Sequence, residues 1–137
     1  MSYLLDTNVL CETFRKRPEP RVIQWIQATT SEELYLSVLT LGEIRKGVEQ
    51  LGVPARRAAL LRWLEVDLPQ WFGKRILPID AKVADRWGYL MATVRRPLPA
   101  IDGLLAATAL THNLQVITRN DADFQLPGVE VINPWKS

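Results

Sequence analysis

The stretch Tyr3-Leu4-Leu5-Asp6-Thr7-Asn8 places a carboxylate directly after a short run of apolar residues. The run is continuously apolar and stops at Asp6, which is typical of a short buried strand. A helix is expected to follow over residues 8–14, and Pro18 and Pro20 then break it. The opening of the chain therefore predicts a strand, an acid at the end of that strand, and a helix.

The same alternation continues along the rest of the chain. Further strands are predicted at residues 34–37, 76–79, 114–118 and 129–132. Helices are predicted at about residues 20–26, 41–51, 56–68, 80–94 with Asp80 as N-cap, and 101–111. Strands that alternate with helices indicate an α/β fold, with a mostly parallel central sheet of about five short strands flanked by helices.

The bulk properties favour an ordinary globular domain. The chain has 137 residues, which is enough for one core, so a single domain over residues 1–137 is expected. No leader peptide or membrane-length apolar run is evident, so we expect a cytoplasmic protein without a membrane partner. Cys11 is the only cysteine, which excludes an intrachain disulfide, and its apolar neighbours favour a buried, unreactive thiol.

Acidic residues stand at the edges of several predicted strands and helices. They are Asp6, Glu43, Asp102, and the pair Asp121 and Asp123. In parallel sheets, ligands bind beyond the carboxyl ends of the strands, and Asp6 and the segment 120–123 each follow a strand. Carboxylate oxygens are the ligands that Mg²⁺ and Mn²⁺ prefer, so a metal site at this edge is one interpretation.

Each acid also has a structural interpretation. Asp6 could cap the helix that follows it, Asp102 suits a first helical turn, and the pattern from Thr40 to Glu43 matches a capping box. Asp121 and Asp123 could simply favour a turn. However, Asp102 lies in an otherwise apolar helix, where an ionised carboxylate needs a partner or a metal. Several carboxylates in one cavity would also repel one another, and a divalent cation removes that repulsion.

Segments 4–8, 37–47, 101–109, 118–124 and 131–135 together resemble the ordered motifs of PIN-domain ribonucleases. More narrowly, the chain is similar to the VapC and FitB toxins of bacterial toxin–antitoxin modules. The resemblance runs from Leu4 to Trp135 and implies a single PIN domain with a PIN-like fold. It implies that four acids are catalytic and bind Mg²⁺ or Mn²⁺, namely Asp6, Glu43, Asp102 and Asp123. Asp121 ranks second for the fourth position.

The resemblance also implies supporting residues, partners and a mechanism. Thr7, Asn8 and Thr118 would orient the acids or the substrate. The partners would be an RNA substrate, a second copy in a homodimer, and a cognate small DNA-binding antitoxin. The reaction would be metal-assisted hydrolysis of RNA, with Asp6 and Asp102 as direct ligands and the other two acids acting through water or a second ion.

Other classes of function remain open to different degrees. A metal-free ribonuclease of the paired-histidine type needs two such groups, whereas His112 is the only histidine and is expected to cap a helix C-terminus. A phosphatase of the haloacid-dehalogenase type requires a second Asp two positions after the first, and this chain has Asn8 there, which argues against that class. A non-catalytic PIN module that binds RNA or a partner is the main alternative, and DNA is not excluded as a substrate.

Basic and aromatic residues supply candidates for substrate binding. Arginine and lysine clusters could contact phosphates, and they lie at residues 15–17, 56–57, 74–75 and 95–96. Trp71 and Trp135 are expected to be exposed enough to stack on unpaired bases. The remaining tryptophans, Trp25, Trp63 and Trp87, are expected in the core.

Overall fold

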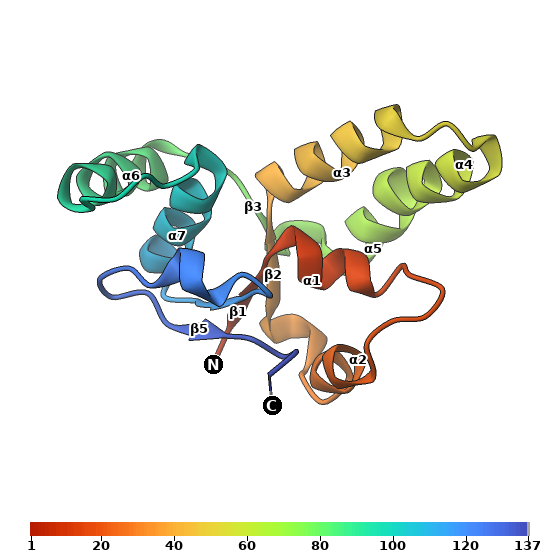
Figure 1. The fold of residues 1–137 in the computed structure, drawn as a ribbon, viewed down its shortest axis with the longest axis horizontal. Coiled ribbons are helices and arrows are strands. Elements are labelled where there is room, and N and C mark those ends of the chain that lie inside the picture. Colours follow the sequence, from red (N-terminus) through yellow and green to blue (C-terminus); the bar gives the residue numbers. More distant parts are fainter. Residues whose placement is uncertain (137) are drawn as a thin grey trace.

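The structure, a computed structural model, describes residues 1–136 and contains a five-stranded sheet (Figure 1). The strands are β1 (Tyr3–Leu5), β2 (Leu34–Ser37), β3 (Ile76–Leu77), β4 (Gln115–Ile117) and β5 (Val131–Ile132). Their order is β3-β2-β1-β4-β5, and every neighbouring pair is parallel. The predicted parallel α/β fold is therefore confirmed, with β1 as the central strand.

Helices connect the strands. They are α1 (Thr7–Glu12), α2 (Pro20–Gln27), α3 (Val38–Gln50), α4 (Pro54–Arg62), α5 (Leu68–Phe72), α6 (Ala81–Thr93) and α7 (Ala100–His112). Asp80 caps α6 as expected, because its Oδ1 accepts a hydrogen bond from the Val83 amide at 3.0 Å. None of the helices in residues 1–136 combines the length and the apolar character that a membrane crossing requires.

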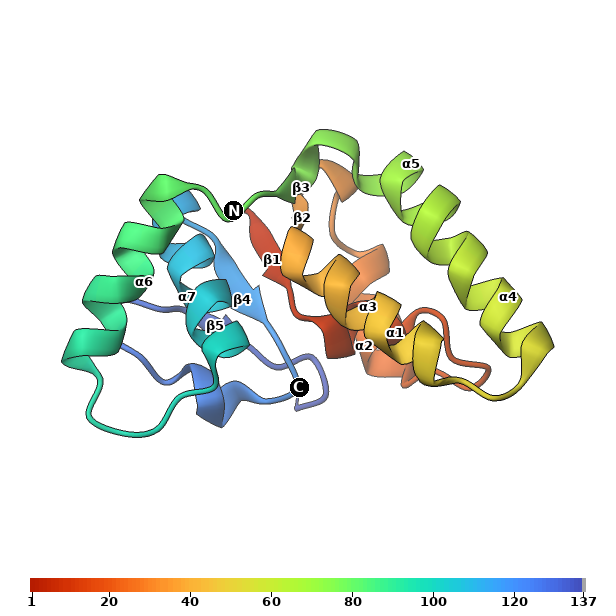
Figure 2. The ribbon, with the colours of Figure 1, turned by 90° about the horizontal axis from the view of Figure 1, so that it is seen from above.

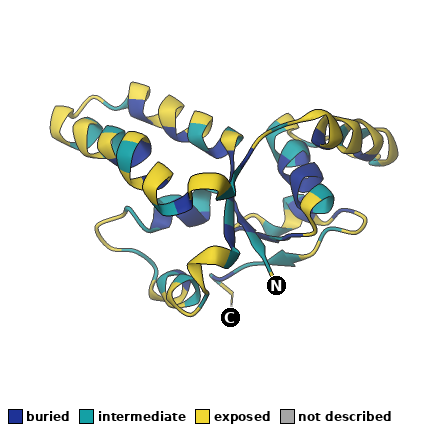
Figure 3. Cartoon of the chain, turned by 180° about the vertical axis from the view of Figure 1, so that it is seen from behind, coloured by how far each residue is buried: buried dark blue, intermediate teal, exposed yellow. Residues whose placement is uncertain are grey.

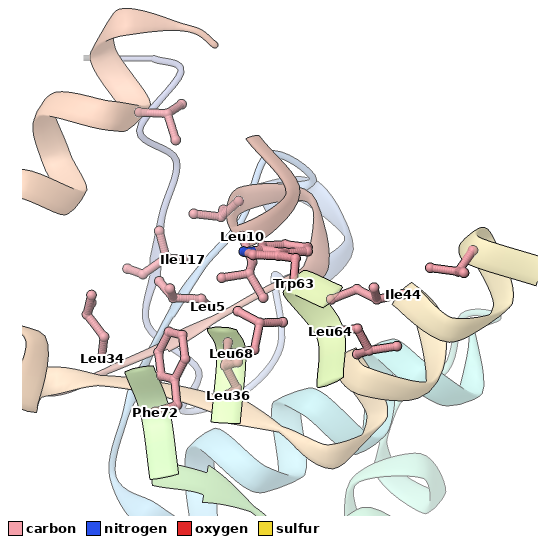
Figure 4. Packing of buried hydrophobic residues seen from close by; sticks show 13 residues of the cluster. Leu5, Leu10, Leu34, Leu36, Ile44, Trp63, Leu64, Leu68, Phe72 and Ile117 are labelled. Atoms are coloured by element: carbon pink, nitrogen blue, oxygen red, sulfur yellow. The ribbon is translucent and has the colours of Figure 1, made fainter. Parts of the chain in front are cut away.

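Two hydrophobic cores lie on opposite faces of the sheet. Successive strand residues point to opposite faces, so Leu5 and Ile117 pack into one core while Leu4 and Val116 pack into the other. The first core lies under α1 to α5, and Figure 4 shows Leu5 and Ile117 among the side chains of that cluster. The second core lies under α6 and α7, which Figure 2 shows together on the other side of the sheet.

Helix α7 is the most buried helix of the second core, as its apolar sequence predicts. Residues 105–109 are all buried, and Figure 3 shows this stretch in the buried colour. Gly103 lets α6 approach closely, because a Cβ there would lie 3.0 Å from Met91 Sδ and 3.1 Å from Trp87 Nε1. This packing holds the first turn of α7, which carries Asp102, against α6.

The single helix predicted over residues 56–68 is corrected. The helical stretch begins at Pro54, widens into a π-helical turn at Trp63–Asp67, and continues as α5 to Phe72. Pro69 explains the widened turn, because a proline has no amide and clashes with the carbonyl four residues before it in a regular α-helix. A wider turn directly before Pro69 relieves both problems.

The capping-box interpretation of Thr40 and Glu43 is wrong. Helix α3 begins at Val38, three residues before the predicted start, and its N-cap is Ser37, whose Oγ accepts a hydrogen bond from the Leu39 amide at 3.0 Å. Thr40 lies inside the helix, and its buried hydroxyl has no hydrogen-bond partner among the described residues. The Glu43 side chain is consequently free to leave its own helix and contact another element.

The tryptophans are also less exposed than the sequence suggested. Trp71 and Trp135 are half-buried rather than exposed, and both pack against the first core. Trp63 is buried there as expected, while Trp25 and Trp87 are half-buried. An open stacking platform for bases is therefore not formed by either of the two proposed tryptophans alone.

Candidate active site

Asp6 occupies the carboxyl end of the central strand. Its backbone amide donates to the Ile117 carbonyl at 2.9 Å, which extends the β1–β4 ladder by one residue. Its Oδ1 accepts a hydrogen bond from the Thr7 amide at 2.8 Å and so caps α1. The residue is only 7% exposed. The capping interpretation is thus confirmed, and the same carboxylate is also buried at the edge where ligands bind in such sheets.

Two polar side chains hold the other oxygen of Asp6. The buried Thr118 hydroxyl donates to Oδ2 at 2.8 Å, and Asn8 Nδ2 donates to the same atom at 3.3 Å. Thr118 Oγ1 also accepts from the Asn120 amide at 3.0 Å, and Asn8 Oδ1 accepts from the Arg119 amide at 3.2 Å. These bonds fasten the loop after β4 to the start of α1, so the Asp6 carboxylate has little freedom to rotate.

Glu43 reaches the same region from α3. Thr7 Oγ1 donates a hydrogen bond to Glu43 Oε1 at 2.6 Å, although the two residues are 36 positions apart. The bond joins the first turn of α1 to the second turn of α3 and leaves the exposed Glu43 carboxylate beside Asp6. Thr7, Asn8 and Thr118, which were predicted to support the site, therefore each hydrogen-bond one of its acids.

Asp102 and Asp123 complete the group of acids. Burial raises the pKa of Asp102 from its ordinary value of 3.8 to about 6, and repulsion from Asp6, Asp123 and Glu43 adds to this rise. Burial also raises the pKa of Asp6, although its hydrogen bonds, led by that from Thr118, oppose the rise. The fold thus brings four acids from four distant segments within electrostatic range of one another. We call Asp6, Glu43, Asp102 and Asp123 the acid cluster.

Asp121 faces a different direction. Its Oδ2 lies 3.1 Å from Lys136 Nζ, and the hydrogen bond from Lys136 holds the pKa of Asp121 below its usual value. Asp123 instead acts on Asp102, and its carbonyl accepts a hydrogen bond from Arg96 Nη2 at 3.2 Å. The geometry therefore favours Asp123 over Asp121 as the fourth member of the cluster.

The donor chemistry of the cluster fits a hard divalent cation. All four groups offer carboxylate oxygens, and their mutual repulsion is what a divalent charge would relieve. Among residues 1–136, no three acidic, histidine or cysteine side chains are positioned to coordinate a single metal ion. Mg²⁺ commonly takes one or two carboxylates and completes its shell with water, so the arrangement suits Mg²⁺ or Mn²⁺ better than Zn²⁺.

Cys11, the nearest thiol, is unsuited to nucleophilic or metal chemistry. Burial raises its pKa from 9.0 to about 11, and the charges of Glu43 and Asp6 contribute further. The thiol therefore stays protonated near neutral pH, and only a thiolate is a good nucleophile or metal ligand. Cys11 is half-buried rather than buried as predicted, whereas its raised pKa agrees with the predicted lack of reactivity.

The sequence did not reveal a brace made by the last residues of the described chain. Asn133 Nδ2 donates to the Arg119 carbonyl at 3.0 Å, and Asn133 Oδ1 accepts from the Trp135 amide at 2.9 Å. The Arg119 guanidinium carbon lies 5.4 Å from the centre of the Trp135 ring. The motif that carries this brace, Asn133-Pro134-Trp135, was visible after the last strand, but its contacts with the active-site loop were not.

Comparisons with known proteins agree with this architecture. A family model described as PIN domain matches residues 3–128. The chain is 35% identical to VapC ribonuclease Y4jK of Sinorhizobium fredii, with 97% of each chain covered. It is 38% identical to Toxin FitB of Neisseria gonorrhoeae, covering 96% of this chain and 97% of FitB. The structure of FitAB bound to an IR36 DNA fragment matches with a TM-score of 0.90 and 36% identity, over 98% of this chain and 96% of that one. With most of its length matched by the family model, this chain belongs to the PIN-domain family.

Proposed function

We propose that the protein is a metal-dependent endoribonuclease that acts as the toxin of a toxin–antitoxin system. The observation that carries the proposal is the acid cluster, in which four carboxylates from separate segments gather beyond the central strand. The two relatives described above, one named as a ribonuclease and the other as a toxin, support the same assignment. All four acids of the proposed catalytic set are intact, as an active enzyme requires.

In this proposal Asp6 and Asp102 would hold Mg²⁺ or Mn²⁺, and Glu43 and Asp123 would act through water or a second ion. A bound ion of this kind polarises a phosphoryl oxygen and lowers the pKa of a coordinated water. The protein contributes orientation: Thr118 and Asn8 fix the Asp6 carboxylate, and Thr7 fixes Glu43 through Oε1. The second oxygen of Glu43 is then available to orient an attacking water and to accept its proton.

The RNA backbone would meet basic side chains beyond the far end of α1. Arg15, Lys16, Arg17 and Arg56, together with Val53, line an open depression of about 600 Å³. Helix α1 begins at the acid cluster and ends close to this depression, so an RNA strand lying along α1 would contact both. Phosphate contacts of this kind position a strand without reading its sequence.

The regulatory part of the proposal concerns partners. We infer a cognate small DNA-binding antitoxin that blocks the acid cluster, and a homodimer of this chain in the cytoplasm. The name of the FitB relative and the matched structure of FitAB with DNA support the antitoxin part of this inference. The summed negative charge of the acid cluster would attract a basic side chain of an inhibitor as well as a cation.

The test is cleavage of total cellular RNA by the purified wild type and by Asp102→Asn, each with Mg²⁺, Mn²⁺ or EDTA. We expect discrete fragments from the wild type with a divalent ion, and none with EDTA or from Asp102→Asn. Asp121→Asn is the matched control, because it removes a neighbouring acid that pairs with Lys136 instead of joining the cluster. It should cleave like the wild type.

Two results would contradict the proposal. Folded wild type that cleaves no RNA with any ion, in the absence of antitoxin, would favour the non-catalytic binding module. Cleavage by Asp102→Asn at the wild-type rate would remove the acid cluster from the mechanism. Parallel reactions on single-stranded DNA would decide whether the activity is restricted to RNA.

A further inference from the structure

We propose that Arg119, held against the ring of Trp135, is a phosphate-contact residue for the RNA strand at the rim of the acid cluster. The inference rests on the proposed ribonuclease function and adds to it a substrate-binding residue. Arg119 lies in the loop between Thr118, which bonds Asp6, and Asp123, which belongs to the cluster.

The backbone of Arg119 is fixed on both sides. Its amide donates to Asn8 Oδ1 at 3.2 Å, and its carbonyl accepts from Asn133 Nδ2 at 3.0 Å. Asn8 is the same side chain that donates to Asp6 Oδ2. The backbone of Arg119 is therefore tied, through one shared asparagine, to the acid at the centre of the proposed reaction.

The side chain of Arg119 is also restrained, although it is exposed. Its guanidinium carbon lies 5.4 Å from the centre of the Trp135 ring, within the range of a cation–π interaction. The ring itself is half-buried, and Asn133 Oδ1 binds its backbone amide. Among residues 1–136, no hydrogen bond uses the N–H donors of this guanidinium, so they remain available to a ligand. A guanidinium edge is well matched to phosphate oxygens.

Five of the other eleven arginines have their charge or their N–H donors satisfied within residues 1–136, whereas Arg119 does not. Arg15, Arg21, Arg45 and Arg57 each pair with a glutamate. Arg75 donates hydrogen bonds to the carbonyls of Ser31, Leu34 and Trp71. Among residues 1–136, no carboxylate lies within ion-pair distance of Arg119, even though Asn8, which accepts from its amide, donates to Asp6 of the acid cluster. Its positive charge is therefore not neutralised by the described part of the chain.

The positive charge of Arg119 offsets the repulsion between the acid cluster and the phosphates of the RNA substrate. Four carboxylates repel an RNA backbone, which carries one negative charge per nucleotide. A fixed arginine at the rim offsets that repulsion and draws a phosphate toward the cluster. The competing explanation is that Arg119 and Trp135 only anchor the end of the chain to the loop. The two explanations predict different kinetics, because an anchor acts through the position of Asn8 and Asp6 and a phosphate contact acts on substrate affinity.

The experiment compares Arg119→Ala, Arg119→Lys and Trp135→Phe with the wild type. Arg86→Ala is the matched control, since Arg86 is an exposed arginine of α6 that makes no ion pair or hydrogen bond among residues 1–136. For Arg119→Ala we expect the KM for cleaved RNA to rise about tenfold, with kcat within about twofold of the wild type, because a charge-assisted contact is lost. Arg119→Lys should keep part of the wild-type affinity for RNA, and Trp135→Phe, in which Arg119 is intact, should keep most of it. Arg86→Ala should bind RNA like the wild type.

A binding measurement separates this inference from the proposed function. A short fluorescein-labelled single-stranded RNA is titrated with each variant in an Asp102→Asn background with EDTA, where cleavage does not interfere. The Arg119→Ala change should weaken binding about tenfold and reduce the slope of log affinity against log salt by about one. This arm gives an answer even if the wild type proves to be no nuclease.

Either of two results would overturn the inference. The first is an Arg119→Ala variant that binds the labelled RNA as tightly as Arg86→Ala does. The second is a loss of kcat with unchanged KM and unchanged salt dependence, which would show that Arg119 only positions the loop. In both cases cleavage by the wild type would leave the proposed ribonuclease function standing.

Discussion

Replacing Asp102 with asparagine should make the folded protein more stable near neutral pH, while abolishing the proposed activity. Burial, followed by the repulsion of Asp6, Asp123 and Glu43, raises the pKa of Asp102 from 3.8 to about 6. A carboxyl group whose pKa is raised by folding favours the folded state while it is protonated. That contribution is fully present below pH 3.8 and is lost as the pH rises through about 6. Asparagine resembles the protonated acid at every pH, so it avoids this loss.

The size of the effect follows from the pKa change. Each pKa unit corresponds to about 1.4 kcal/mol, so the full change would amount to about 3 kcal/mol. Solvent screens a carboxylate that is only partly buried, which reduces the expected gain to about 1–2 kcal/mol. For a domain of this length, that corresponds to a Tm increase of roughly 3–8 °C.

The assay is thermal or urea unfolding in EDTA at about pH 7.5 and about pH 3.5, on either side of the two pKa values. Asp102→Asn should be more stable than the wild type at the higher pH and nearly equal to it at the lower pH. Asp121→Asn is the control, since the Lys136 hydrogen bond lowers the pKa of Asp121 and loss of its charge should bring no gain. Equal stabilisation at both pH values, or none at the higher one, would refute the view that burial and the neighbouring acids raise the pKa of Asp102.

Three other changes test the packing and chemistry around the site. Thr118→Val should lower the free energy of unfolding by about 2 kcal/mol, because it removes a buried hydrogen bond to the Asp6 carboxylate. Thr118→Ser keeps the hydroxyl and should retain most of the wild-type stability. Equal stability of the two variants would count against that bond. Gly103→Val should lower the free energy of unfolding in urea by about 1–3 kcal/mol, since even a Cβ would lie 3.0 Å from Met91 Sδ and 3.1 Å from Trp87 Nε1. An unchanged urea midpoint would mean that α6 and α7 can separate freely. Mg²⁺ at about 100 times its Kd should stabilise the wild type by about 2.7 kcal/mol, with EDTA reversing the gain, and an unchanged Tm would argue against a metal site in the folded protein.

The elements of the fold were predictable where local patterns decide them. The strands at residues 3–5 and 34–37 were predicted with the bounds that the structure shows, because each is a short apolar run closed by a polar residue. The Asp80 cap and the buried helix α7 followed from one residue type and from nearly continuous apolar composition. The position of Asp6 at the sheet edge followed from the parallel topology itself.

The contacts that build the site could not be predicted in the same way, because they join distant segments. The Thr40–Glu43 pattern fits a capping box, yet Glu43 bonds Thr7, which only the packing of α1 against α3 brings near. Pro69 indicates that a regular helix is disturbed before it, but not whether the helix ends, kinks or widens into the π-helical turn that the structure shows. The brace of Arg119 by Trp135 likewise depends on the end of the chain crossing the loop after β4.

The Cys11 thiol offers a native reporter of the charge of the acid cluster. Part of the rise in its pKa to about 11 comes from the negative charges of Glu43 and Asp6, with burial as the larger cause. A cation that settled among the acids would cancel some of that charge and increase the fraction of thiolate, which is the form that reacts with alkylating agents. The rate at which this one cysteine is alkylated would therefore rise with metal occupancy, so ion binding could be followed in the wild-type sequence without RNA and without turnover.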